Sequence, residues 1–186
     1  VYSARFMGDV GYFVTFRQVD PLFSVDLSDP ANPEIIGELK IPGFSEYLHP
    51  YGDGKLLGIG MDVDEAGVTT EGVKVSMFDV SDPSDVKELT NCVLEDMYGT
   101  DVGYNYKAVF VDVEKNLFGF LAYGNVSKYY IFTYDENGFR EVFSRELTVY
   151  GDVRGLYAGD RFYLVSGNTV ESFTMDGFKK VDDIVL

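Results

Sequence analysis

The chain has no tryptophan and contains only one cysteine and one histidine in 186 residues. Cys92 alone cannot form an internal disulfide or a cysteine-rich zinc site. His49 alone excludes a three-histidine zinc site. No apolar run approaches the roughly 18 residues that a membrane-spanning helix needs, and we recognise no signal peptide. Because the first residue is Val1 and not Met, we expect a fragment of a longer chain.

Basic residues are scarce: 15 Lys and Arg stand against 31 Asp and Glu, which gives a net charge of −16. A surface of this charge repels nucleic acid and anionic lipid, so we expect no nucleic-acid partner. It can hold cations or basic partners, or it can simply keep the protein solvated. Hydrophobic residues make up 46% of the chain and charged residues 25%, as in ordinary globular domains.

Helical signals are also missing, because no window shows apolar residues at i, i+3, i+4 and i+7 over three turns. Strand signals recur instead, as in "GYFVTF" (11–16), "LFSVDLS" (22–28) and "EIIGELKI" (34–41). Turn residues bound these runs, and the whole chain contains 20 glycines. We therefore expect an all-β fold with almost no helix.

The strand segments form four groups of four, and one phrase sets their register. The phrase "VDLSDP" around Asp26 returns as "FDVSDP" around Asp79, and eroded versions surround Thr133 and Thr174. The steps between these positions are 53, 54 and 41 residues. A four-stranded unit that repeats every 40 to 55 residues is typical of a β-propeller blade. A β-sandwich is the alternative, but it does not require the second-strand phrase to recur as well, as it does here.

The repeat predicts a β-propeller made of four-stranded antiparallel blades. Its four blades are expected at about residues 1–42, 43–96, 97–147 and 148–186. Each group is expected to begin with its innermost strand and to end with its outermost. Residues 1–186 then form a single β-propeller domain or part of a larger one.

Three stretches resemble known families. "FSVDLSDPANPEIIGELKIPG" (23–43) resembles the LVIVD-type repeat of secreted β-propellers. The stretches 5–30 and 40–53 are similar to a family of secreted bacterial and archaeal proteins with a C-terminal β-propeller domain. The resemblance implies an extracellular or cell-surface location and a larger native propeller. A missing propeller half or a second copy, as in a homodimer, would then complete the ring.

The recurring Asp-Ser-Asp-Pro phrase has two interpretations. Asp26 and Asp29 could bind a cation, or their carboxylates could accept hydrogen bonds from the amides of a turn. The same chemistry at two equivalent places favours the turn.

The segment "MDVDEAGVTTEG" (61–72) is the longest expected connection between a second and a third strand. Asp62, Asp64 and Glu65 offer the oxygen ligands that Ca²⁺ prefers, although the EF-hand pattern fails at two positions. The segment is either a Ca²⁺ site formed by Asp62 and Asp64 or an acidic hairpin tip without a ligand. Ca²⁺ is the only cofactor that the sequence suggests.

Polar and aromatic residues gather at one predicted face of the propeller. The loops between second and third strands share this face with the connections between groups, because strand direction alternates. We predict a ligand site there, formed by Arg17, Gln18, Asp20, Tyr98, Asp101 and Tyr104. Arg17 and Asp20 could instead clamp their own turn, and the tyrosines could serve packing only.

No catalytic constellation accompanies His49, because the sequence has neither a nucleophile elbow nor a triad pattern. We expect a non-catalytic binding module of a secreted or cell-surface protein, with a protein or carbohydrate ligand. The alternative is a hydrolase-like or metal-assisted enzyme that acts on an extracellular polymer at an acidic axial site. A purely structural spacer is a third interpretation.

Overall fold

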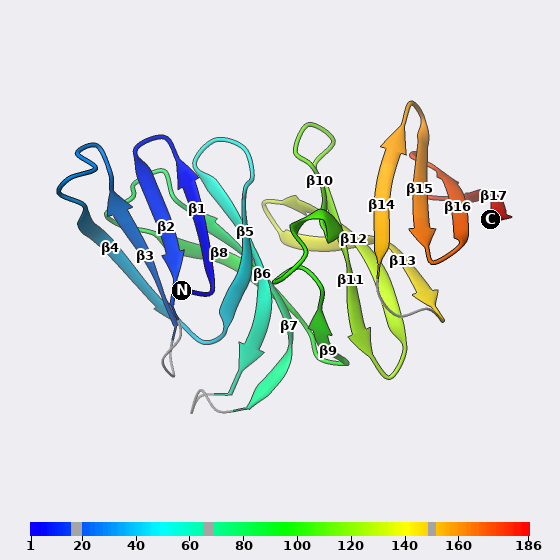
Figure 1. Ribbon diagram of the computed structural model, residues 1–186, viewed down its shortest axis with the longest axis horizontal. Helices are drawn as coiled ribbons and strands as arrows, with labels where there is room; N and C mark the ends of the chain where they lie inside the picture. Colours follow the sequence, from blue (N-terminus) through cyan, green and yellow to red (C-terminus); the bar gives the residue numbers. More distant parts are fainter. Residues whose placement is uncertain (16–19, 65–68, 149–151) are drawn as a thin grey trace. The chain divides into compact units, whose positions relative to one another are not determined.

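The computed structural model describes residues 1–15, 20–64, 69–148 and 152–186, which are built almost entirely of β-strands (Figure 1). The described residues contain a single helical turn, η1 (Tyr106–Ala108). No helix in these residues is long and apolar enough to cross a membrane. The expected all-β fold with almost no helix is therefore confirmed.

The strands form four antiparallel sheets in which chain order equals spatial order. The first sheet contains β1 (Ser3–Met7), β2 (Val10–Val14), β3 (Asp20–Asp26) and β4 (Glu34–Ile41). The second contains β5 (Phe44–Pro50), β6 (Lys55–Val63), β7 (Thr70–Asp79) and β8 (Lys87–Leu94). The third contains β10 (Phe110–Asp112), β11 (Leu117–Gly124), β12 (Ser127–Asp135) and β13 (Gly138–Leu147), and β9 (Met97–Thr100) also pairs with β11. The fourth contains β14 (Val153–Ala158), β15 (Arg161–Ser166), β16 (Thr169–Thr174) and β17 (Lys180–Val185).

A β-bulge recurs at the same place in every sheet, between the third and fourth strands. The pairing shifts at Ser24/Val25, Met77/Phe78, Ile131/Phe132 and Ser172/Phe173. These positions are 53, 54 and 41 residues apart, which are the steps that the sequence phrase predicts. The extra residue on each fourth strand is aliphatic: Ile36, Leu89, Val142 or Val181. The repeat register is thus confirmed at the level of single residues.

The recurring Asp phrase forms turns. Asp26 and Asp79 each accept a hydrogen bond from the amide two residues later, at 2.8 and 3.0 Å. Asp29 and Asp82 do the same at 3.1 and 2.9 Å. The pKa of all four carboxyls is lowered, for Asp26 chiefly by the Ser28 amide and for the other three chiefly by side-chain hydrogen bonds: Asp29 with Asn32, Asp79 with Ser81 and Asp82 with Ser84. The turn interpretation accounts for both copies of the phrase.

The chain divides into two compact units, Val1–Tyr98 and Gly99–Leu186, each with two sheets and a core of its own. In the first unit β1 contacts β5, so the two sheets meet along their first strands. The core there contains the buried side chains Tyr12, Val14, Leu22, Leu48, Leu56, Phe78, Val80 and Val86. In the second unit β14 contacts β10 and β11, and the core contains Phe110, Leu121, Tyr129, Ile131, Leu147, Val153, Phe162, Leu164 and Phe173.

Candidate binding site

Asp101 and Tyr104, two of the residues that the sequence singles out, lie together in the second unit. The backbone amides of Tyr104 and Asn105 donate to the carbonyl oxygen of Asp101, at 3.3 and 2.9 Å. This turn brings the Tyr104 hydroxyl onto the Asp101 carboxylate, to which it donates a hydrogen bond. Asp101 is only 4% exposed, whereas Tyr104 is 79% exposed. A buried carboxylate therefore holds an exposed aromatic ring in place.

A second tyrosine approaches the same carboxylate from β11. The Tyr123 side chain hydrogen-bonds to Asp101, and burial together with this bond raises the pKa of its hydroxyl. The hydrogen bond to Asp101 likewise raises the pKa of Tyr104. Both phenols therefore stay protonated and donate. Thr100, next to Asp101, donates to the carbonyl oxygen of Leu121 at 2.6 Å and anchors the turn on the same strand.

The stretch that contains this turn is unusually rich in exposed tyrosine. Tyr98, Tyr104 and Tyr106 are 61%, 79% and 69% exposed. The Lys107 ammonium lies 5.8 Å from the centre of the Tyr106 ring. Tyr106 is not among the residues that the sequence predicts, although its spacing of two residues from Tyr104 is a usable signal. Large exposed rings with a polar end suit sugars and protein surfaces alike.

The remaining predicted ligand residues are not tested by the structure. Arg17 and Gln18 lie outside the described residues. Asp20 begins β3, where its backbone pairs with Ile41, but its side chain also lies outside the described part. Tyr98, the last residue of the first unit, is 61% exposed, and its predicted role remains a prediction.

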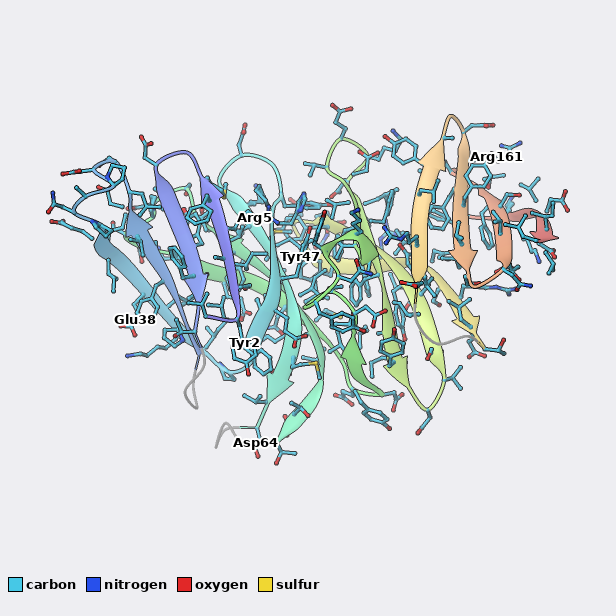
Figure 2. All side chains as sticks on the ribbon, viewed as in Figure 1. Tyr2, Arg5, Glu38, Tyr47, Asp64 and Arg161 are labelled. Atoms are coloured by element: carbon cyan, nitrogen blue, oxygen red, sulfur yellow. The ribbon has the colours of Figure 1, made fainter. Side chains whose placement is uncertain are left out.

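The predicted Ca²⁺ ligand Asp62 faces a lysine. Its carboxylate lies 3.5 Å from the Lys74 ammonium, which is buried, lies 3.6 Å from Glu88, and donates to the carbonyl oxygen of Pro42 at 2.8 Å. Asp64 closes the β6–β7 hairpin through a 2.9 Å bond from its amide to Thr69, and Figure 2 shows it at the end of that hairpin. Glu65 lies outside the described residues, which contain no group of three or more metal-ligating side chains.

An open groove of about 790 Å³ lies at the other end of β11 from Tyr123. Its lining residues are Lys115, Leu117, Thr133, Arg140, Glu141, Val142, Met175, Asp176, Gly177 and Phe178. Phe178 has a left-handed backbone conformation (φ 49°). The centre of its ring lies 5.3 Å from that of Phe143 and 5.7 Å from that of Phe162. The strained residue thus completes the core, and the charges along the groove are of both signs.

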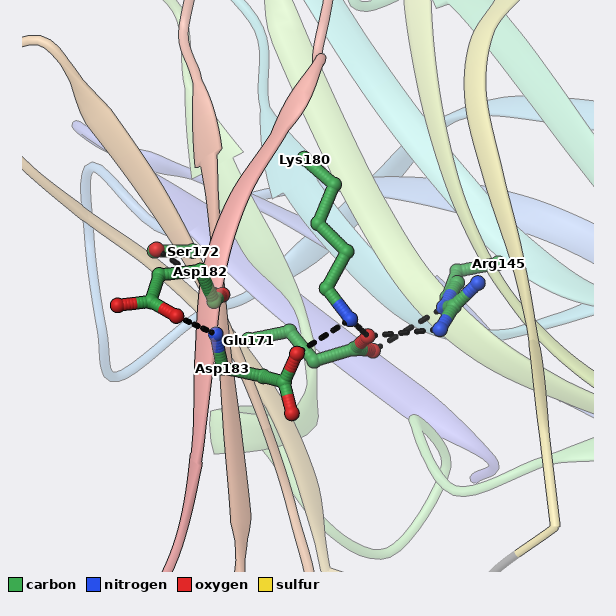
Figure 3. A network of polar contacts seen from close by, with 6 residues as sticks. All are labelled: Arg145, Glu171, Ser172, Lys180, Asp182 and Asp183. Atoms are coloured by element: carbon green, nitrogen blue, oxygen red, sulfur yellow. Dashed lines mark hydrogen bonds and ion pairs between the residues drawn. The ribbon is translucent and has the colours of Figure 1, made fainter.

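A buried carboxylate, Glu171 on β16, links the third and fourth sheets (Figure 3). Its oxygens lie 2.7 Å from Nη2 of Arg145 on β13 and 3.0 Å from the Lys180 ammonium on β17. Burial opposes ionisation of Glu171, but the hydrogen bonds from the two cations prevail and lower its pKa. This network is structural, because every charged group in it is already paired.

Comparison with known proteins identifies the architecture. The family described as Beta propeller domain matches residues 1–178. An uncharacterized protein of Archaeoglobus fulgidus is 39% identical over 188 residues, which cover this whole chain and 28% of that protein. An uncharacterized protein of Methanocaldococcus jannaschii is 38% identical over 137 residues, covering 74% of this chain and 20% of the other. The chain thus spans between a fifth and a third of the length of these relatives.

Solved structures agree in fold. A europium-containing methanol dehydrogenase superposes with a TM-score of 0.58 at 11% identity, covering 98% of this chain and 41% of the other. Apo AztD from Citrobacter koseri superposes with a TM-score of 0.56 at 14% identity, covering 98% and 46%. At such low identity these similarities concern the fold alone.

Proposed function

Because the chain belongs to the Beta propeller domain family and its four sheets are blades, we propose that it is a non-catalytic binding module of an extracellular or cell-surface protein. Its ligand contacts the exposed rings of Tyr104 and Tyr106 beside Asp101. The observation that carries the proposal is the Tyr104 ring, which is 79% exposed and yet fixed through its hydroxyl by a buried carboxylate.

A fixed exposed ring is favourable for binding because little side-chain entropy remains to be lost. Immobilising a flexible side chain at an interface costs about 0.5–1.5 kcal/mol. The bond to Asp101 meets that cost during folding, before any ligand arrives. Tyrosine also offers a large apolar face and a polar end with few rotatable bonds, which explains its frequency in binding surfaces.

The ligand class that fits these groups best is a carbohydrate polymer. The C–H faces of a sugar can stack on the tyrosine rings. The overall negative charge of −16 favours neutral over acidic polymers at this surface. The resemblance to secreted propeller proteins supports the extracellular location.

The test is binding of the chain to a panel of neutral and acidic polysaccharides, followed by calorimetry on the best ligand. We expect Tyr104→Ala to weaken binding by about tenfold or more, and Tyr104→Phe, which keeps the ring but loses the Asp101 bond, to weaken it less. Tyr2→Ala is the matched control, since Tyr2 is 47% exposed and lies in the other unit.

Equal affinities of Tyr104→Ala and Tyr2→Ala would place the ligand elsewhere. Binding to a protein and to no polysaccharide on the panel would retain the module but overturn the carbohydrate assignment.

A further inference from the structure

A second polar cluster lies on the first strands of the first two blades, away from the tyrosine-rich turn in sequence. Strand β5 contains a bulge at Glu46, since Ser45 pairs with Gly60 and Tyr47 with Ile59. Gly60 permits the bulge, because a Cβ atom there would collide with the carbonyl oxygen of Phe44. After the bulge, Tyr47 and His49 are two residues apart and lie on one side of the strand.

These two side chains contact each other. The Tyr47 hydroxyl lies 2.8 Å from Nδ1 of His49, and the two rings are stacked with centroids 5.9 Å apart. Burial, reinforced by the positive charge of Arg5, lowers the pKa of His49, so the imidazole is neutral at neutral pH. Since Nδ1 faces the Tyr47 hydroxyl, Nε2 is the ring nitrogen left for another partner.

Arg5 reaches this pair from β1. Its Nε donates to the carbonyl oxygen of Leu48 at 2.8 Å, and its guanidinium carbon lies 5.8 Å from the centre of the Tyr47 ring. Ser3, two residues earlier, donates to the carbonyl oxygen of Ser45 at 2.7 Å. Figure 2 shows Arg5 and Tyr47 on these adjacent strands. The carbonyl bond occupies Nε, and the guanidinium also hydrogen-bonds to the Tyr47 side chain, which leaves its remaining terminal N–H groups for other acceptors.

The charge of Arg5 is not balanced by an acidic side chain in the described residues. In this unit Lys40, Lys74 and Lys87 each lie within 3.6 Å of a carboxylate, whereas none of the ion pairs among the described residues includes Arg5 or Lys55. A half-buried guanidinium without a counter-ion is unfavourable, and an anionic ligand would remove that penalty.

We propose that Arg5, Tyr47 and His49 form a binding site for an oxyanion, the carboxylate or phosphate group of a ligand. The Arg5 guanidinium supplies the positive charge and a planar pair of donors, a geometry that matches both groups. The Tyr47 hydroxyl donates to Nδ1 of His49, which places the imidazole proton on Nε2, and Nε2–H donates to the anion at its side. The site differs from the tyrosine-rich turn in its residues and in the charge of its ligand.

The single histidine gives a direct experiment on the whole 186-residue chain. The Cε1–H signal of His49 in the NMR spectrum is unambiguous, and it reports on contacts of the imidazole. Sodium phosphate and sodium acetate are titrated separately at constant ionic strength, with sodium chloride as the reference. We expect a saturable shift with phosphate, acetate or both, and the stronger of the two identifies the group that the site prefers.

Arg5→Gln is expected to lower the anion affinity obtained from this titration by at least about tenfold, since it removes the charge from the charge-assisted hydrogen bonds. Lys40→Gln, which removes an equal charge from an exposed side chain of the same unit, is expected to leave it unchanged. Tyr47→Phe keeps the Arg5–Leu48 bond but removes the hydroxyl that contacts His49. It is expected to lower the affinity for the anion by severalfold. It serves as the second variant if Arg5→Gln lowers the yield of folded protein.

Two results would overturn the proposal. One is a shift that rises linearly with both anions and matches the chloride reference. The other is a saturable shift that folded Arg5→Gln and Tyr47→Phe retain at full affinity.

Discussion

The two units place opposite charges at the centre of their buried ion networks. In the first unit one lysine, Lys74, lies between the carboxylates of Asp62 and Glu88, at 3.5 and 3.6 Å. In the second unit one carboxylate, Glu171, lies between Arg145 and Lys180, at 2.7 and 3.0 Å. Each central side chain is under a tenth exposed. The same blade plan therefore tolerates either sign at a buried polar position, provided that two opposite charges surround it.

The apolar cores differ as well. In the first unit, the cluster of eight buried residues that includes Leu56 has only two aromatic members, Tyr12 and Phe78. In the second unit, the cluster of nine that includes Leu164 has four: Phe110, Tyr129, Phe162 and Phe173. Aromatic pairs there meet edge to face, as Phe143 does with Phe173 at 4.9 Å. Such pairs have directional preferences, so the stability of the second unit is expected to be more sensitive to substitutions that change the shape of a core side chain.

The largest expected effect comes from Phe162→Ala, which breaks the aromatic core of the second unit. Phe162 is 0% exposed and contacts five other rings, so the cavity should cost about 3–5 kcal/mol. Hydrogen exchange read separately for residues 1–98 and 99–186 should show the loss in the second unit. Leu56→Ala is the matched change in the first unit, and an equal loss of protection in both units for either variant would contradict the division.

Lys74→Met should have the next largest effect, because it leaves Asp62 and Glu88 facing each other without a cation. Their side chains are 18% and 16% exposed, so water screens their repulsion poorly. Breaking such a buried network costs about 3 kcal/mol in denaturant unfolding at pH 7. Lys74→Arg keeps a cation between the two carboxylates and should therefore cost less, and an equal loss in both variants would point to packing alone.

Glu171→Gln should cost less, about 1–2 kcal/mol, because the two cations left behind are 43% and 42% exposed and remain solvated. The folded-state pKa of Glu171 is lowered, so its contribution to stability is present above the ordinary pKa of a glutamate. That contribution is lost as pH falls through the folded-state value. Stability curves of the parent chain and Glu171→Gln should therefore converge in acid, and parallel curves would refute the role of the charge.

The smallest expected effect concerns His49 in the first unit. Its folded-state pKa is lowered below the ordinary value of 6.5, so the unfolded chain binds the proton more readily. The free energy of unfolding should decline as pH falls through 6.5 and level off below the folded-state pKa. His49→Gln should flatten this part of the curve, which urea unfolding at several pH values would measure. An unchanged slope would contradict the lowered folded-state pKa of His49.

The sequence predicts the blades well because their signal is local and repeated. The phrase around Asp26 and Asp79 contains turn residues whose hydrogen bonds span two or three positions, so no tertiary information is needed. The pairing of Asp101 with Tyr104 is also local, since one turn brings the two residues together. Both kinds of contact are set by spacing along the chain.

Contacts between blades escaped sequence reasoning because they join residues that are far apart in the chain. Arg5 lies 43 residues before Leu48, and nothing near Arg5 in sequence marks it as a partner of Tyr47. Within one blade, the ion pair of Asp62 with Lys74 could not be predicted either, because Lys74 lies on the next strand, across a pairing that only the folded sheet defines. The contact of His49 with Tyr47 is local, but no sequence motif marks it.

The bulge that recurs in every outermost strand has a consequence for behaviour at high concentration. A strand at the rim of a sheet offers unpaired backbone groups to any passing chain. The extra residue, such as Leu89 in β8 or Val181 in β17, interrupts the regular spacing of those groups and increases the local twist. A foreign strand then cannot add in continuous register. Each repeat thus carries its own protection against edge-to-edge aggregation, copied along with the blade.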